Sequence, residues 1–138
     1  MDVVFLIGRI LFVLVFVPSG ATIHMSRQGV EYARMYNAPA PELLVPASGV
    51  AIVVGGLLVA LGIWADLGAL ILGAFVVAIA PIMHAFWKEE DAQMRGIQQS
   101  QFMKNVALAG GALVLFYAYN QLQGAAGLSI TDPLFGRG

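Results

Sequence analysis

Residues 81–111 of this chain read PIMHAFWKEEDAQMRGIQQSQFMKNVALAGG. An apolar segment ends there at His84 and Trp87, a charged and glutamine-rich connection follows, and a second apolar segment begins at Phe102. Ionisable groups near membrane depth are costly, so His84 and Lys104 mark either a functional site or a buried hydrogen-bonding partner. The stretch therefore predicts two membrane helices joined by a polar connection outside the membrane.

The composition supports a membrane location for the whole chain. Of 138 residues, 59% are hydrophobic and only 11% are charged, which leaves too few polar groups to cover a soluble domain of this size. The net charge of -1 gives no electrostatic footprint for a nucleic acid partner. The chain has no cysteine, so it offers no disulfide, thiolate metal ligand or cysteine nucleophile. Redox chemistry would need electrons carried by another group.

Four apolar segments are long enough to cross the ~30 Å hydrocarbon core. The first is not preceded by a basic region, so we interpret it as a retained helix and not as a signal peptide. Short connections favour an up-down topology. We predict one all-α domain over 1–138, a transmembrane four-helix bundle with a surface tail at 123–138. The predicted membrane helices are residues 3–24, 43–65, 67–87 and 102–122.

Small residues recur along the second apolar segment. Gly49 and Gly56 are seven residues apart, and so are Gly55 and Gly62. Small residues on one stripe allow neighbouring helices to approach closely. We therefore interpret these glycines as packing positions.

The two longer connections hold most of the charge. In residues 24–42, Tyr32 and Tyr36 lie on one helical face, which predicts a short helix in the membrane interface. In residues 88–101, Asp91 and Arg95 are spaced as a helical ion pair. Five of the seven Lys and Arg residues flank these connections. The positive-inside rule then places both connections in the cytoplasm and both chain termini outside.

The candidate binding residues gather at the predicted cytoplasmic end. One hypothesis is a shallow pocket in which His84 and Lys104 bind the carbonyl of a quinone or an anionic headgroup. The alternative is structural: His84 bonds to backbone or to Asn105, while Lys104 extends to lipid phosphates. We predict no catalytic residue and a ligand-binding set of His24, His84, Trp87, Lys104 and Asn105.

A metal site is a weaker alternative at the same end. His24, His84 and the acidic run 89–91 share this face, and two histidines with a carboxylate can hold iron or zinc. No pair of ligands has a close metal-binding spacing, so we predict no metal site and a solvated acidic loop.

Arg9 lies at the opposite end, in the first apolar segment. Asp66, Asn120 and Gln121 fall at a similar predicted depth, and pairing with them would compensate a buried charge. We interpret Arg9 as a residue that ties the helices together. The sequence has no catalytic triad, nucleotide loop or haem motif, so we do not expect an enzyme acting alone.

The order of these features resembles the DoxX family of small four-helix membrane proteins. The resemblance rests on Gly8-Arg9, on 55–58 (GGLL), on 84–87 (HAFW) and on 102–111 (FMKNVALAGG). The lysine and the acidic residue that family members often carry in the first and second helices are missing here. The resemblance implies a bacterial inner-membrane protein linked to redox metabolism, because a related branch is a subunit of thiosulfate:quinone oxidoreductase.

Three functions follow as expectations. The first is an accessory subunit of a membrane redox or respiratory assembly, with no cofactor of its own. The second is a subunit that handles a quinone or another small molecule near His84 and Lys104. The third is a small transporter, which at this length would have to be a homo-oligomer to enclose a path.

Overall fold

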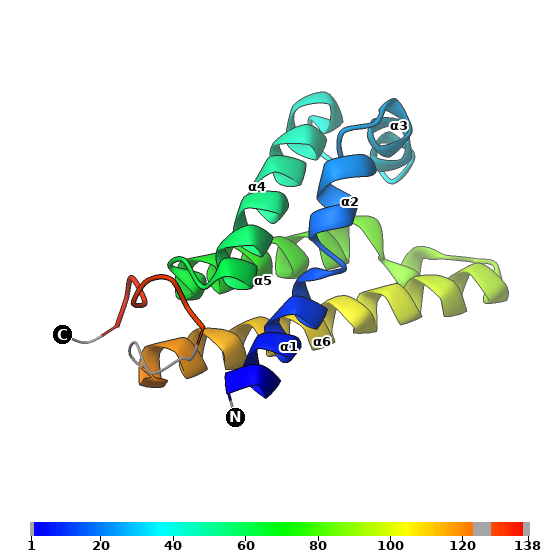
Figure 1. Cartoon of the computed structure of the whole chain (residues 1–138). Coiled ribbons are helices and arrows are strands. Elements are labelled where there is room, and N and C mark those ends of the chain that lie inside the picture. The colour runs from blue at the N-terminus through cyan, green and yellow to red at the C-terminus, as the bar shows by residue number, and fades with distance from the viewer. Residues whose placement is uncertain (1, 123–127, 137–138) are drawn as a thin grey trace.

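The structure, a computed structural model, describes residues 2–122 and 128–136 (Figure 1). Within these residues, all the regular secondary structure is helical. Four segments are long and apolar enough to cross a membrane: Asp2–Thr22, Pro41–Leu61, Ala65–Lys88 and Ala92–Leu122. The prediction of an all-α membrane protein with four spanning segments is confirmed. The elements are α1 (Asp2–Val13), α2 (Val17–Thr22), α3 (Arg27–Met35), α4 (Pro41–Leu61), α5 (Ala65–Met83), the 3-10 turn η1 (Phe86–Lys88) and α6 (Ala92–Leu122).

The first spanning segment is two helices and not the one that we expected over 3–24. The α-helical pattern stops after Val13, where Phe16 N donates to Val13 O at 3.0 Å. Pro18 then sits in the first turn of α2. A proline inside a continuous helix has no N–H to donate, and its ring clashes with the carbonyl four residues earlier. The break before Pro18 avoids both costs and lets α2 turn away from the axis of α1.

The bundle is closed at one end and splayed at the other. Helix α5 packs against α4 and α6, and α4 also packs against α1, α2 and α3. Near the chain termini α1 contacts both α4 and α6, whereas α2 leans on α4. Figure 1 shows α4 diverging from the antiparallel pair α5 and α6 towards the end that carries α3. The buried apolar core lies in the middle and includes Phe16, Ile52, Val59, Leu72 and Val76.

Glycines allow α4 to be approached closely on two sides, as predicted. A Cβ atom added at Gly20 of α2 would lie 2.8 Å from the carbonyl oxygen of Gly49. A Cβ atom added at Gly68 of α5 would lie 2.7 Å from the carbonyl oxygen of Gly55. Backbone atoms cannot yield as side-chain ends can, so any larger residue would push the helices apart. Gly49, Gly55 and Gly56 are confirmed as packing positions, whereas Gly62 ends α4 in a left-handed turn against Ser129.

Both polar connections contain helix. Helix α3 forms within 24–42 and is capped by Ser26, whose hydroxyl accepts from Gly29 N at 3.0 Å. Helix α6 begins at Ala92, well before the predicted start at 102. Its 31 residues measure about 46 Å, more than the ~30 Å hydrocarbon core, so its polar beginning extends beyond the membrane.

The spacing of Asp91 and Arg95 predicted helix in this connection, which α6 confirms, but the two side chains do not form an ion pair. The Asp91 carboxylate instead accepts from Met94 N at 2.8 Å, and the Arg95 guanidinium donates to Glu89 O at 3.0 and 2.8 Å. The first N–H groups of a helix need acceptors, and the Asp91 carboxylate supplies one. An ion pair between exposed side chains would stabilise the protein little in water, so it does not compete with this cap.

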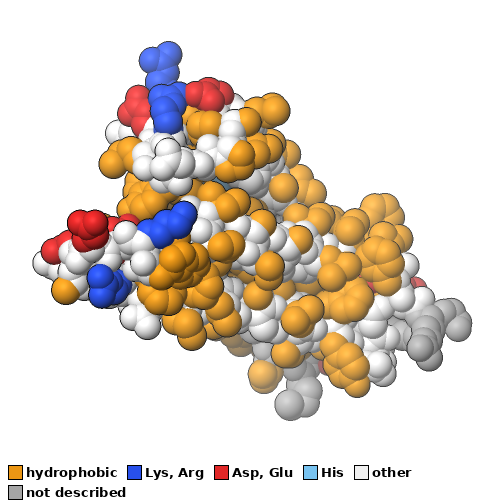
Figure 2. Space-filling model, turned by 180° about the vertical axis from the view of Figure 1, so that it is seen from behind, with side chains coloured by type: hydrophobic (Ala, Val, Ile, Leu, Met, Phe, Trp, Pro, Cys, Tyr) orange, Lys and Arg blue, Asp and Glu red, His pale blue; other side chains and the backbone are white. Residues whose placement is uncertain are grey.

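Charged side chains gather at the splayed end. Figure 2 shows hydrophobic side chains over most of one face, with the Lys, Arg, Asp and Glu side chains of that view concentrated at the end that carries α3 and the start of α6. An apolar band with charges at one end is the surface expected of a protein that crosses a bilayer.

The C-terminal segment 128–136 folds back over the closed end. Ile130 N and Thr131 N both donate to Gly62 O at 3.0 Å, and Trp64 N donates to Thr131 Oγ1 at 2.9 Å. The turn beneath it needs a left-handed residue, and Gly62 supplies it with φ of 67°. This described part of the predicted surface tail is therefore tied to the α4–α5 turn.

Arg9 is buried there, but with partners other than those we predicted. Its guanidinium donates to Tyr119 Oη at 3.0 Å, to Ser129 Oγ at 2.9 Å and to Leu128 O. Asp66 is also buried, yet its carboxylate accepts from the backbone N–H groups of residues 134 and 135 at 2.9 and 2.7 Å. Arg9 does tie α1 to α6, while pairing with Asp66, Asn120 or Gln121 does not occur.

Candidate binding cavity

The splay of the bundle leaves a cavity of about 760 Å³ between α2, α3 and α4 on one side and α5 and α6 on the other. Its inner walls are apolar and include Ile52, Phe75, Val76 and Leu108. Ligand-binding cavities in proteins typically measure about 300–1,000 Å³ and combine apolar walls with a few polar groups. The volume and walls of this cavity fit that description.

Polar groups line the outer end of the cavity, and no Asp or Glu is among the lining residues. Four of the five predicted binding residues contribute to the lining, although they come from distant parts of the chain. Gln98 and Tyr36, which we did not predict, line it as well. The polar residues that line the cavity include Tyr36, His24, Ser48, His84, Gln98, Lys104 and Asn105.

His84 follows the last turn of α5 and bonds to Gln98, and not to backbone or Asn105 as the structural alternative predicted. Its Nδ1 lies 2.8 Å from Gln98 Oε1. Gln98 is only 2% exposed, and its Nε2 donates to Tyr36 Oη at 2.6 Å. The buried Gln98 amide is hydrogen-bonded through both its oxygen and its nitrogen, so it fixes the positions of His84 and Tyr36. The signal that we missed was the spacing of Gln98, Gln101 and Asn105 on one face of a helix.

His24 lies between α2 and α3 and faces α4. Its Nδ1 lies 2.9 Å from Ser48 Oγ and 3.3 Å from Val45 O. Its ring meets Phe75 of α5 edge-on, with the ring centroids 5.6 Å apart. Burial lowers the pKa of His24, and the bond to the Val45 carbonyl opposes this only in part. The lowered pKa favours the neutral form of the ring.

Lys104 and Asn105 occupy the α6 side of the cavity. The Lys104 ammonium donates to Gln101 Oε1 at 2.6 Å and is otherwise exposed, so it can reach a ligand or a lipid phosphate. Asn105 is 6% exposed, and its side chain has no hydrogen bond to the other residues of 2–122 and 128–136. Its amide remains free to bond to an occupant of the cavity.

Trp87 does not reach the cavity. It is 54% exposed and packs edge-on against Phe86 and Phe102, with ring centroids 5.2 and 5.6 Å apart. An exposed aromatic cluster at the end of a spanning helix is typical of the interface with lipid headgroups. The structure therefore separates Trp87 from the other four predicted residues.

A sequence model of the DoxX family matches residues 4–85, more than half of the chain. The protein belongs to the DoxX family. The match includes both histidines of the cavity but ends before the 102–111 motif on which our resemblance partly rested. No curated protein and no solved structure matches the chain. Family membership and the four spanning segments together make this a multi-pass membrane protein of the DoxX type.

The alternative metal site is not assembled in this DoxX protein. No group of three or more His, Asp or Glu side chains comes close enough to hold an ion anywhere in the described part of the chain. The Nδ1 atoms of the two histidines bond to side chains on different helices. The acidic run 89–91 instead takes part in the start of α6.

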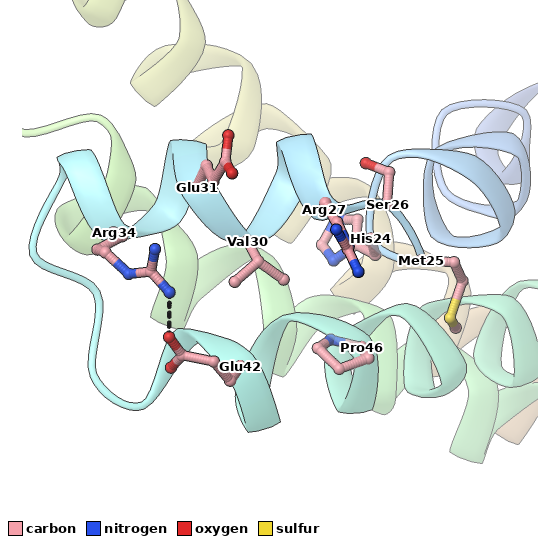
Figure 3. Close-up of a pocket in the computed structure, with 9 residues that line it drawn as sticks. All are labelled: His24, Met25, Ser26, Arg27, Val30, Glu31, Arg34, Glu42 and Pro46. Carbon is pink, nitrogen blue, oxygen red and sulfur yellow. Dashed lines mark hydrogen bonds and ion pairs between the residues drawn. The ribbon is translucent and has the colours of Figure 1, made fainter.

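A second pocket of about 400 Å³ lies between α3 and α4. Figure 3 shows Val30 pointing at α4 and Arg34 reaching Glu42, with which it forms an ion pair. Arg27 and Glu31 also line the pocket, so its charges balance. His24 lines both this pocket and the larger cavity, and therefore belongs to the wall between them.

Proposed function

We propose that this DoxX protein binds a small molecule with an apolar body and a hydrogen-bonding head, of the quinone class, in the cavity at its splayed end. The observation that carries the proposal is one partly open cavity that combines apolar walls with polar lining residues, none of which is a carboxylate. The polar residues His24, His84, Lys104 and Asn105 come together at this cavity from two connections, α2–α3 and α5–η1, and from helix α6.

The residues present fit a quinone. Its ring and chain would lie against Phe75, Val76 and Leu108, and its oxygens would accept from the Lys104 ammonium and the Asn105 amide. The absence of carboxylates avoids repulsion of an oxygen-rich head. When bound, a quinone supplies electron and proton transfer that the side chains themselves do not. The role of the chain is to bind and orient the molecule.

We further propose that the protein works as a subunit of a membrane redox assembly. The DoxX resemblance points to quinone-linked redox metabolism, and a chain without cysteine has no thiol of its own to carry electrons. A partner would then exchange electrons with the bound molecule. The same resemblance supports a location in the bacterial cytoplasmic membrane. The positive-inside rule supports an orientation with residues 24–42 and 88–101 on the cytoplasmic side.

Calorimetric titration of a decyl-substituted benzoquinone into the protein in lipid nanodiscs tests the binding. Ala78 lines the cavity, so Ala78→Phe should fill it and weaken binding by roughly tenfold or more. Ala74 is on the same helix, exposed and outside the cavity, so Ala74→Phe should leave the affinity unchanged. Equal affinities for the two variants would place the ligand elsewhere and contradict the proposal.

Purification from the native membrane in a gentle detergent, followed by mass spectrometry, tests the assembly. A redox enzyme retained in fixed stoichiometry would support a subunit role. A homo-oligomer without a redox partner would contradict it and favour the transporter alternative, because a chain of this length must oligomerise to enclose a path.

A further inference from the structure

The hydrogen bonds of His24 determine where its proton lies. Ser48 Oγ donates its own hydrogen to Val45 O at 2.7 Å, so towards His24 the hydroxyl oxygen acts as an acceptor. Val45 O, the other neighbour of His24 Nδ1, is a carbonyl and can only accept. Nδ1 must therefore carry the proton, and in the neutral ring Nε2 is left as a hydrogen-bond acceptor.

His84 is held in the same form by different residues. Gln98 Nε2 donates one hydrogen to Tyr36 Oη, and its Oε1, which has no hydrogen, faces His84 Nδ1. In this orientation of the amide, Nδ1 of His84 is the donor. In the neutral ring, Nε2 again becomes the acceptor.

Both Nε2 atoms remain accessible. Neither makes a hydrogen bond to another residue within 2–122 and 128–136. In the same part of the chain, Arg9 Nε is the one fully buried side-chain nitrogen or oxygen without a partner. The two imidazole Nε2 atoms are thus unpaired but reachable, and both rings line one cavity.

We infer that the cavity recognises a molecule whose head donates hydrogen bonds from hydroxyl groups, such as a hydroquinone, in preference to the same molecule without those hydrogens. The inference rests on the proposed function and specifies its ligand. The Nε2 atoms of His24 and His84 are two acceptors at one cavity, so they favour a ligand head with two O–H groups. The hydroxyl oxygens can still accept from Lys104 and Asn105, so a dihydroxy head satisfies both sets of groups. Ser48 and Gln98 act as positioning residues, because each fixes the proton of one histidine.

A matched pair of ligands tests this without altering the protein. Decyl-hydroquinone and its dimethyl ether share the ring, the chain and the acceptor oxygens, but only the first can donate. When each is titrated anaerobically into the protein in nanodiscs, the hydroquinone should bind about tenfold more tightly than the ether. This is the expected effect of one or two hydrogen bonds that the ether cannot make in a desolvated site. Equal affinities, or tighter binding of the ether, would overturn the inference while leaving the binding function in place. If neither ligand binds, the inference fails, and the separate titration with the benzoquinone decides whether the proposed function fails as well.

The tautomers of His24 and His84 can be measured by ¹⁵N NMR without any ligand. The chain has only two histidines, so the imidazole ¹⁵N spectrum of labelled protein contains two rings. In their neutral forms, both rings should show a protonated Nδ1 and an unprotonated Nε2. An Nε2-protonated ring at either position would overturn the inference even if the cavity binds ligands.

Gln98→Met removes the acceptor of His84 at similar volume and should reduce the preference for the hydroquinone over the ether by severalfold. Gln99 is the exposed neighbour on the same helix, so Gln99→Met should preserve the preference. An unchanged preference in correctly folded Gln98→Met would show that Gln98 does not position His84.

Discussion

His24 and His84 were predicted at the same membrane depth because each ends an apolar segment, and both line the cavity. Their hydrogen-bonding partners were not predictable in the same way. Ser48 and Gln98 reach them across helix contacts that depend on how α4 and α6 are rotated. A residue's depth follows from its position in an apolar run, whereas its partner follows from packing.

The stability of the folded protein should depend on pH through His24. Burial holds the pKa of His24 below its usual value of 6.5, so between these two values the unfolded chain binds more protons than the folded one. The free energy of unfolding should therefore be highest above pH 6.5 and fall as the pH drops through the lowered pKa. Equilibrium unfolding in mixed micelles at pH 7.5 and pH 5.5 measures this.

The control is His24→Gln, which keeps a polar side chain but has no imidazole to protonate. Carboxylates titrate in both proteins, so the difference between their pH profiles isolates His24. An identical loss of stability on acidification in both proteins would contradict the prediction.

The hydrogen-bonding partners of Arg9, at the closed end of the bundle, were also not predictable from the sequence. Its role in joining helices was correct, but its partners are a tyrosine, a serine and a backbone carbonyl. A planar guanidinium donates in several directions at once and so can bridge α1, α6 and the C-terminal segment. Asp66, the opposite charge nearest in predicted depth, is occupied by backbone N–H groups of residues 134 and 135.

At the scale of elements, the contact between α4 and α5 depends on glycine. We expect Gly68→Ala to destabilise the protein by about 1–3 kcal/mol, because the added methyl group would lie 2.7 Å from a backbone oxygen and force the helices apart. Gly110→Ala should instead be neutral or stabilise by roughly 0.5–1 kcal/mol, because nothing lies within 4 Å and alanine favours the helix.

Unfolding of both variants in mixed micelles provides the comparison. The two substitutions are chemically identical and both lie in spanning helices, but Gly68 is buried between helices whereas Gly110 is exposed. A loss of stability for Gly110→Ala equal to that for Gly68→Ala would contradict the packing explanation.

At the scale of the whole molecule, the sorting of charges to the splayed end predicts an orientation. We expect the α5–α6 connection in the cytoplasm and the C-terminal segment outside. The chain has no cysteine, so single substitutions at the exposed residues Glu90 and Asp132 can be labelled without background.

With a membrane-impermeant maleimide on spheroplasts, Asp132→Cys should react at once and Glu90→Cys only after permeabilisation. The parent chain, which should not react, is the control. The reverse labelling pattern would show that the protein has the opposite orientation.

The sequence by itself determined that the chain crosses a membrane with four helices, that glycines bring these helices close, and that most charges share one end. These properties follow from hydropathy, spacing and residue size, all of which are local. The tertiary structure alone decided where the bundle opens. The break before Pro18 and the leaning of α2 on α4 leave α5 and α6 uncovered at that end, and such geometry depends on contacts between distant segments. The cavity, the partners of both histidines and the closing of the C-terminal segment over Arg9 all result from those contacts.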